Sequence, residues 1–218
     1  MNKMLTKRLQ KIVDAIPLCN TLADVGCDHG YIGIAALSEN KAQNVVFIDI
    51  SAPSLAKAKQ NLPCNLCQKA TFVHADGLGN IIADCAVIAG MGGLEIMSIL
   101  SGAADLPQML VLQPMKNQYE LRRFLLADYN VESDELFFDG KYYDLIVARK
   151  CAERQTLSEL QLRFGLSNLK EPSDDFAMYV RNEQQKLISI LKQCDDSSVK
   201  ARLELVNTVA AVIREEQI

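Results

Sequence analysis

Acidic and glycine residues in the first turn of the chain form a pattern that could hold a nucleotide-type ligand. The apolar segment Leu22–Val25 carries Asp24 near its end, and Gly26, Asp28 and Gly30 follow it. Glycines without Cβ atoms let a ligand approach the backbone, and the helix that begins here points unpaired N–H groups at it. This pattern predicts a binding site at the first β–α turn of a doubly wound sheet.

Two further carboxylates follow the next two apolar segments. Asp49 ends the segment 44–49, and Asp76 with Gly77 follows 71–75. The first can accept hydrogen bonds from both ribose hydroxyls of an adenosine, and the second can accept one from the exocyclic amine of adenine. An Asp-Gly pair can also be a purely structural turn. Three such turns at the carboxyl ends of successive strands converge on one crevice, which favours an adenosine cofactor.

The charge of the first turn discriminates among adenosine cofactors. Asp28 stands where the middle glycine of G-x-G-x-x-G would fall, and a carboxylate there repels a pyrophosphate. NAD and FAD are therefore disfavoured, and no G-x-x-x-x-G-K-[ST] loop indicates an ATPase. S-adenosylmethionine carries a sulfonium and an ammonium group, which Asp24 and Asp28 would attract. The predicted cofactor-binding residues are Asp24, Gly26, Cys27, Gly30, Tyr31, Asp49, Ile50, Asp76, Gly77, Gly90, Met91 and Gly92.

The elements that position these turns alternate between strands and helices. Apolar segments predict five strands, helices lie between them, the last helix covers 118–129, and an Asp-Gly hairpin over 135–148 follows. We expect an α/β fold, a mostly parallel sheet with one antiparallel edge strand. The closing hairpin resembles the Rossmann-like sheet of class I S-adenosylmethionine-dependent methyltransferases. Residues 1–150 form the predicted cofactor-binding domain.

Residues 151–218 differ in character and predict a small C-terminal helical domain. Apolar residues follow a 4-3 spacing from Phe176 to Cys194 and again from Val199 to Ile213, with a turn over 195–198. Two such seams predict an antiparallel helical hairpin, a coiled-coil arm. The arm either packs onto the main domain as ordinary core or projects to grip a large substrate. The sequence leaves both interpretations open.

Composition limits the other classes of function. The chain has 218 residues, a net charge of −4 and seven cysteines, and no apolar run is long enough for a membrane span. The odd cysteine number and a polar N-terminus without signal-peptide character predict a cytoplasmic protein with reduced thiols. Cys64 and Cys67 have the spacing of half a zinc site. The sequence has no second pair of Cys or His at a matching spacing to complete it, so we expect no metal. A monomer is favoured over an oligomer.

The residues 2–16 predict a basic amphipathic helix that ends at Pro17. Lys3, Lys7, Arg8 and Lys11 lie mostly opposite its apolar face. This helix either forms a lid over the edge of the sheet or presents its charges to phosphate groups.

Several motifs together resemble one bacterial family. The segments 24–31 (DVGCDHGY), 88–93 (IAGMGG) and 112–114 (LQP) are similar to those of the TrmK family, the tRNA (adenine-22) N1-methyltransferases. The motifs run in the same order at the same predicted strand ends, and the similarity covers nearly the whole chain. The family usually has asparagine where this chain has Met115, so no role of that asparagine carries over. The resemblance implies tRNA as partner and S-adenosylmethionine as cofactor.

The resemblance also implies roles for residues near the predicted turns. A ring nitrogen presents its own lone pair, and the turn 90–93 offers backbone and space rather than acceptors for an amine. Asp28 is predicted to stabilise the methylated base by charge or by accepting a proton, or to orient the methionine part of the cofactor. His29 either assists proton release or is structural. The predicted substrate-binding residues are Lys7, Arg8, Gln113, Pro114, Met115 and Lys116, with Arg122 and Arg123 as further candidates for phosphate contact.

Two other functions remain open at this point. The same fold could methylate a small molecule, a protein or another RNA. Alternatively, the chain could be a catalytically idle RNA-binding protein that uses its helical arm.

Overall fold

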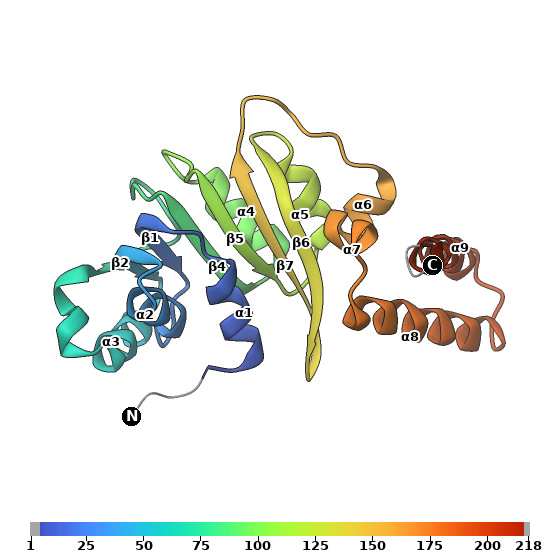
Figure 1. The fold of residues 1–218 in the computed structure, drawn as a ribbon, viewed down its shortest axis with the longest axis horizontal. Coiled ribbons are helices and arrows are strands. Elements are labelled where there is room, and N and C mark those ends of the chain that lie inside the picture. Colours follow the sequence, from blue (N-terminus) through green and yellow to red (C-terminus); the bar gives the residue numbers. More distant parts are fainter. Residues whose placement is uncertain (1–4, 216–218) are drawn as a thin grey trace.

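The computed structural model describes residues 5–215 and contains a seven-stranded sheet with the order β3-β2-β1-β4-β5-β7-β6 (Figure 1). The first five strands pair in parallel, and the reversed strand is β7, beside the edge strand β6. This confirms the predicted α/β fold with a mostly parallel sheet. The strands are β1 (Cys19–Val25), β2 (Ala42–Asp49), β3 (Ala70–His74), β4 (Cys85–Met91), β5 (Met109–Pro114), β6 (Tyr129–Asp139) and β7 (Lys141–Lys150).

Helices cover both faces of the sheet and bury two separate cores (Figure 1). Apolar side chains of α1, α2 and α3 pack on one face, and those of α4 and α5 pack on the other. Central strands between two such layers are apolar throughout, which explains the uninterrupted apolar segments of the sequence. These helices are α1 (Lys7–Ala15), α2 (Tyr31–Ser38), α3 (Ala52–Asn61), α4 (Gly93–Ser101) and α5 (Gln118–Leu125), and a 3-10 helix η1 (Cys64–Lys69) precedes β3.

The C-terminal helices form a third core against the outer edge of the sheet. Leu136 of β6 and Phe164 pack with Phe176 and Val206. Figure 1 shows α8 running outward from β6, with α9 beside it. The arm therefore packs onto the sheet at its base and extends outward beyond it. The helices are α6 (Glu159–Phe164), α7 (Leu166–Lys170), α8 (Asp174–Leu191) and α9 (Ser197–Glu215).

Several element boundaries differ from those predicted. The helix after β5 ends at Leu125, because Tyr129 is buried in β6 and its hydroxyl donates to the Pro107 carbonyl oxygen at 2.7 Å. The hairpin is longer than predicted and spans 129–150, and 151–158 is not helical. The first helix begins at Lys7, where the Thr6 hydroxyl caps it by accepting from Leu9 N–H. Residues 2–4 of that prediction, including Lys3, lie outside the described residues.

Three further features belong to the part of the chain that the structure describes. None of its helices is long and apolar enough to cross a membrane. Between residues 5 and 214, no three His, Cys, Asp or Glu side chains are grouped so that they could hold a metal ion. All seven cysteines are free thiols.

Candidate active site

A cavity of about 470 Å³ opens at the carboxyl ends of β1 to β4. Among the described residues that line it, three are acidic, namely Asp49, Asp76 and Glu95, and none is Lys or Arg. A site of this charge disfavours phosphate groups and favours a cationic ligand. The remaining wall is mostly apolar, which suits a planar base. Its other lining residues are Val25, Gly26, Ile48, Ile50, Ala75, Gly77, Met91, Ser98 and Ile99.

Asp49 holds the first turn in place while lining the cavity. One carboxylate oxygen accepts from the backbone N–H of Asp28 at 2.9 Å, and the other accepts from that of Ser51 at 2.8 Å. Each carboxylate oxygen has a second lone pair that these bonds leave unused. Asp49 can therefore fix the turn between β1 and α2 and still accept hydrogen bonds from a ligand.

Gly26 brings the first turn against the turn after β4. Its φ of +69° lies in the left-handed region, and a Cβ built on it would lie 2.0 Å from the Cε of Met91. A side chain at this position would thus strain the backbone and displace Met91 from the cavity wall. The glycine is what allows the two turns to share one cavity.

Asp24 lies behind the cavity and is buried. Its Oδ2 accepts from the Gly33 backbone N–H at 2.9 Å, which ties β1 to the first turn of α2. Burial raises the pKa of the Asp24 carboxyl to about 7, the Gly33 N–H opposes this rise, and the charge of Asp49 adds to it. Asp24 is therefore a buried acid that titrates near neutral pH.

The stability of the ligand-free protein is expected to fall between about pH 4 and pH 7 relative to an Asp24→Asn variant. In the unfolded chain Asp24 loses its proton near 3.8, whereas in the folded protein it keeps the proton until about pH 7. Across this range the unfolded state binds fewer protons than the folded state. Raising the pH therefore lowers the free energy of unfolding. Each unit of pKa difference corresponds to about 1.4 kcal/mol. Urea denaturation at a series of pH values measures the difference, and parallel profiles of the two proteins would contradict it.

Asp28 and His29 stand on the turn but do not line the cavity. Asp28 has a φ of +44°, and its side chain is 61% exposed. Its Oδ2 lies 3.7 Å from Nε2 of His29, whose ring stacks on that of Tyr31 at 5.3 Å between centroids. The turn thus presents a carboxylate and an imidazole side by side at the surface.

The structure brings together half of the predicted cofactor-binding residues. Those that line the cavity are Gly26, Asp49, Ile50, Asp76, Gly77 and Met91, whereas Asp24, Cys27, Gly30, Tyr31, Gly90 and Gly92 are outside its lining. Sequence reasoning missed a whole wall formed by Glu95, Ser98 and Ile99 of α4. Their i, i+3, i+4 spacing directly after the turn 90–93 is the signal that could have indicated one helix face toward the site.

The predicted substrate-binding residues at the end of β5 divide into buried and exposed pairs. Gln113 and Pro114 are buried, whereas Met115 and Lys116 are exposed. The Gln113 side-chain oxygen accepts from Nη1 of Arg8 at 2.6 Å, and its Nε2 donates to the Pro114 carbonyl oxygen at 3.1 Å. Arg8 therefore connects α1 to the strand end beside the cavity.

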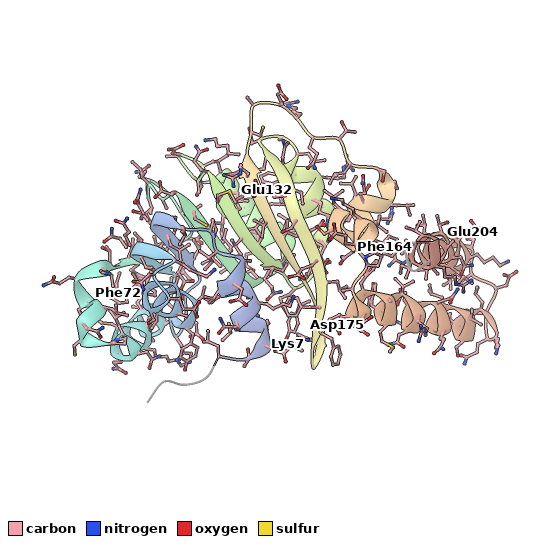
Figure 2. The ribbon with its side chains drawn as sticks, viewed as in Figure 1. Lys7, Phe72, Glu132, Phe164, Asp175 and Glu204 are labelled. Atoms are coloured by element: carbon pink, nitrogen blue, oxygen red, sulfur yellow. The ribbon has the colours of Figure 1, made fainter. Side chains whose placement is uncertain are left out.

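Lys7 and Lys11 also fasten α1 to neighbouring elements. Lys7 Nζ donates to the Phe138 carbonyl oxygen at 2.8 Å and lies 3.3 Å from Asp175 (Figure 2). Lys11 Nζ pairs with Glu135 at 3.0 Å. These contacts to the β6–β7 hairpin are those expected of a lid over the edge of the sheet. Contact of Lys7 and Arg8 with phosphate groups stays a prediction.

The suggestion that Arg122 contacts phosphate is wrong. Its side chain is completely buried and donates from Nε to Asp134 at 2.9 Å and from Nη2 to Asp144 at 2.7 Å. Its Nη1 donates to the Leu162 carbonyl oxygen at 3.2 Å. Arg122 instead joins α5 to the hairpin and to α6, whereas the neighbouring Arg123 is exposed.

Comparison with known proteins identifies similar chains. Residues 22–215 match the model of the TrmK family, described as tRNA (adenine(22)-N(1))-methyltransferase. The Bacillus subtilis tRNA (adenine(22)-N(1))-methyltransferase is 34% identical over 158 residues, which cover 68% of this chain and 66% of that protein.

Solved structures are similar over almost the whole chain. The crystal structure of the B. subtilis m1A22 tRNA methyltransferase TrmK superposes with a TM-score of 0.77 at 26% identity and covers 97% of this chain and 98% of that one. Mycoplasma capricolum TrmK in complex with S-adenosylhomocysteine gives a TM-score of 0.83 at 24% identity and covers 97% and 100% of the two chains. The second likeness concerns the fold alone.

Proposed function

Because the chain belongs to the TrmK family of tRNA (adenine(22)-N(1))-methyltransferases, we propose that it methylates N1 of adenine 22 in tRNA with S-adenosylmethionine as the methyl donor. The single observation that carries the proposal, beyond the family, is the cavity at the carboxyl ends of β1 to β4. It combines three carboxylates with apolar walls and has no cation among its described lining residues. The proposed activity belongs in the cytoplasm, where tRNA is found, and a monomer stays a prediction.

The residues present fit this cofactor. Asp49 would accept from the ribose hydroxyls, and Asp76 would accept from the adenine amine. Ile50 and Ile99 would flank the base, and Met91 closes the wall toward the turn after β4. When bound, S-adenosylmethionine supplies an electrophilic methyl group. The residues of this cavity bind and orient it and exclude water from around it.

The turn after β4 suits a ring nitrogen as the acceptor. Gly90 and Gly92 have no side chains, so this turn offers no side-chain acceptor for an amine. Adenine N1 carries an in-plane lone pair and needs positioning rather than deprotonation before transfer. The product base is cationic, so a nearby carboxylate would stabilise it.

Asp28 is the carboxylate that we assign to this role, and an Asp28→Asn variant is expected to lose about a hundredfold in single-turnover rate. Asparagine tolerates the positive φ of this position and preserves the shape of the side chain. The affinity for S-adenosylhomocysteine, measured by calorimetry, should stay within threefold of wild type. A variant with normal rate and weakened cofactor affinity would instead assign Asp28 to orienting the cofactor.

Methyl transfer from labelled S-adenosylmethionine to unmodified tRNA tests the function. N1-methyladenine blocks Watson–Crick pairing, so primer extension should stop at adenine 22 of the product. A tRNA in which adenine 22 is replaced by guanosine is the control and should stay unlabelled. Tight cofactor binding without incorporation into tRNA would move the acceptor to another RNA, a protein or a small molecule. Loss of cofactor binding itself would favour an idle RNA-binding protein.

A further inference from the structure

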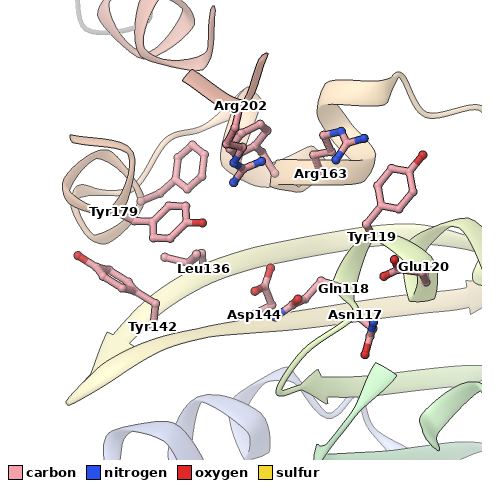
Figure 3. Close-up of a pocket in the computed structure, with 12 residues that line it drawn as sticks. Asn117, Gln118, Tyr119, Glu120, Leu136, Tyr142, Asp144, Arg163, Tyr179 and Arg202 are labelled. Atoms are coloured by element: carbon pink, nitrogen blue, oxygen red, sulfur yellow. The ribbon is translucent and has the colours of Figure 1, made fainter. Parts of the chain in front are cut away.

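A second cavity, of about 370 Å³, lies where the helical arm meets the sheet. Figure 3 shows residues from the start of α5, from β6 and β7, and from α6, α8 and α9 around it. Its volume falls in the range of about 300–1,000 Å³ that small-ligand pockets occupy. It shares no described lining residue with the cofactor cavity.

Aromatic rings and guanidinium groups dominate the wall of this second cavity. The Arg163 guanidinium lies 4.7 Å from the centre of the Tyr119 ring, and that of Arg202 lies 4.7 Å from the centre of the Phe164 ring. Tyr142 and Tyr179 meet edge to face at 5.2 Å on another side (Figure 3). Aromatic faces that stack bases, combined with arginines that pair with phosphates, are the chemistry of single-stranded RNA recognition.

The arginines keep donors available for a ligand. Arg163 pairs with Glu159 at 2.6 Å, and Nε of Arg202 lies 3.6 Å from Glu183. Their side chains are nevertheless 37% and 30% exposed. A guanidinium group has five N–H donors, so Arg202 keeps donors available although it also bonds the Tyr179 side chain. Of the acidic residues in the lining, Asp144 and Glu120, the first already accepts from the buried Arg122.

The turn after β4, which contributes to the cofactor cavity, is hydrogen-bonded to the turn after β5, which contributes to this cavity. The Met91 carbonyl oxygen accepts from Met115 N–H, and Gly93 N–H donates to the Lys116 carbonyl oxygen, both at 2.8 Å. A Cβ on Gly93 would lie only 2.5 Å from the carbonyl oxygen of Asn117. Met91 lines the first cavity and Asn117 lines the second, so the two sites are joined through these residues.

Lys116 lies next to both turns, because it directly precedes Asn117 in the chain and its side chain passes Gly92. Its side chain is exposed, and a Cβ on Gly92 would lie 2.9 Å from its Cε. Among the side chains that the structure describes, none forms a hydrogen bond or an ion pair with its ammonium group. A strand that presents a base beside Met91 would therefore pass this cation before it reaches Asn117.

We propose that the second cavity binds a nucleotide adjacent to the target adenine, with its base against the aromatic rings and its phosphate paired with Arg163 or Arg202. The proposal rests on the proposed function, because it takes tRNA as the ligand. The helical arm supplies Arg202 and Tyr179, so its role is to complete a substrate pocket. Splaying out a neighbour also helps to expose a base that is stacked within the tRNA body.

The test measures binding of unmodified tRNA to the full chain by filter retention. Arg163→Gln and Arg202→Gln are each expected to weaken tRNA binding about tenfold, and Tyr119→Leu should do the same by removing a stacking face. Each arginine variant should also reduce the slope of log affinity against log salt by about one. Affinity for S-adenosylhomocysteine should equal that of wild type, which shows that the variants fold.

Arg154→Gln is the matched control, because Arg154 is an exposed arginine on the segment between β7 and α6 and lines neither cavity. Its tRNA affinity should stay within twofold of wild type. Wild-type affinity in all three cavity variants, or an equal loss in Arg154→Gln, would overturn the proposal. These readouts are independent of methyl transfer, so a failure of the proposed activity would be seen separately.

A fluorescent base identifies the bound nucleotide. The probe is a tRNA that carries 2-aminopurine on one side of adenine 22. Because stacking quenches this base, the bound tRNA should be brighter in complex with Tyr119→Leu, which lacks one ring, than in complex with wild type. Equal fluorescence of the two complexes at both flanking positions would show that the cavity does not hold a neighbour of adenine 22, and the proposal would fail.

Discussion

An Arg122→Met variant is expected to lose about 3–5 kcal/mol in free energy of unfolding, because removing one member of a buried ion pair leaves the charge of the other uncompensated. The guanidinium group is fully buried and bonds Asp134, which is equally buried, as well as Asp144. Burial raises the pKa of Asp134, and Arg122 opposes that rise. Without Arg122, a carboxylate with no exposed surface would keep its charge unpaired or take up a proton. Urea denaturation measures the loss.

Arg149→Gln is the control for this prediction. Arg149 pairs with Glu132 at the surface, where such pairs contribute about 0–1 kcal/mol. Hydrogen exchange should show in addition that α6 and α7 open more readily in Arg122→Met, because Arg122 also bonds the Leu162 carbonyl oxygen. A loss as small as that of the control would contradict the prediction that Arg122 stabilises the packing of α5 against the hairpin and α6.

Cofactor affinity is expected to fall about a hundredfold in an Asp49→Ala variant, because hydrogen bonds to a charged acceptor contribute about 1.5–3 kcal/mol each. The variant loses the proposed contacts to the ribose and also frees the backbone N–H groups of Asp28 and Ser51. The freed N–H groups loosen the turns that follow β1 and β2. Calorimetric titration with S-adenosylhomocysteine measures the change without requiring a substrate.

Asp84→Ala separates the two causes. Asp84 also accepts two backbone N–H groups, those of Asn20 and Thr21, but it precedes β4 and does not line the cofactor cavity. Its loss should lower stability while the affinity for S-adenosylhomocysteine stays within threefold of wild type. Equal losses of affinity in both variants would mean that Asp49 acts only as a structural acceptor.

The positions of the strands along the chain and the first three turns of the site follow from local patterns. An apolar segment that ends in a carboxylate and glycines indicates a buried parallel strand with its turn at one edge. Asp49 and Asp76 were therefore assigned to one crevice, and both line the cavity. The helix after β5 was predicted too long, because a period of 3.6 cannot reveal that Tyr129 belongs to a strand.

Which turns lie at the carboxyl edge of the sheet, the charge of the first turn and the family can be inferred from the sequence alone. Three features emerge only from the packing of the folded chain: Arg122 is buried, α4 forms a wall of the cofactor cavity, and the arm closes a second cavity beside α5. The difference lies in the range of the interactions. Periodicity and turn chemistry act over a few residues, whereas burial of a charge depends on which distant elements pack around it. The partners of Arg122 come from β6, β7 and α6, and no local pattern of α5 specifies them.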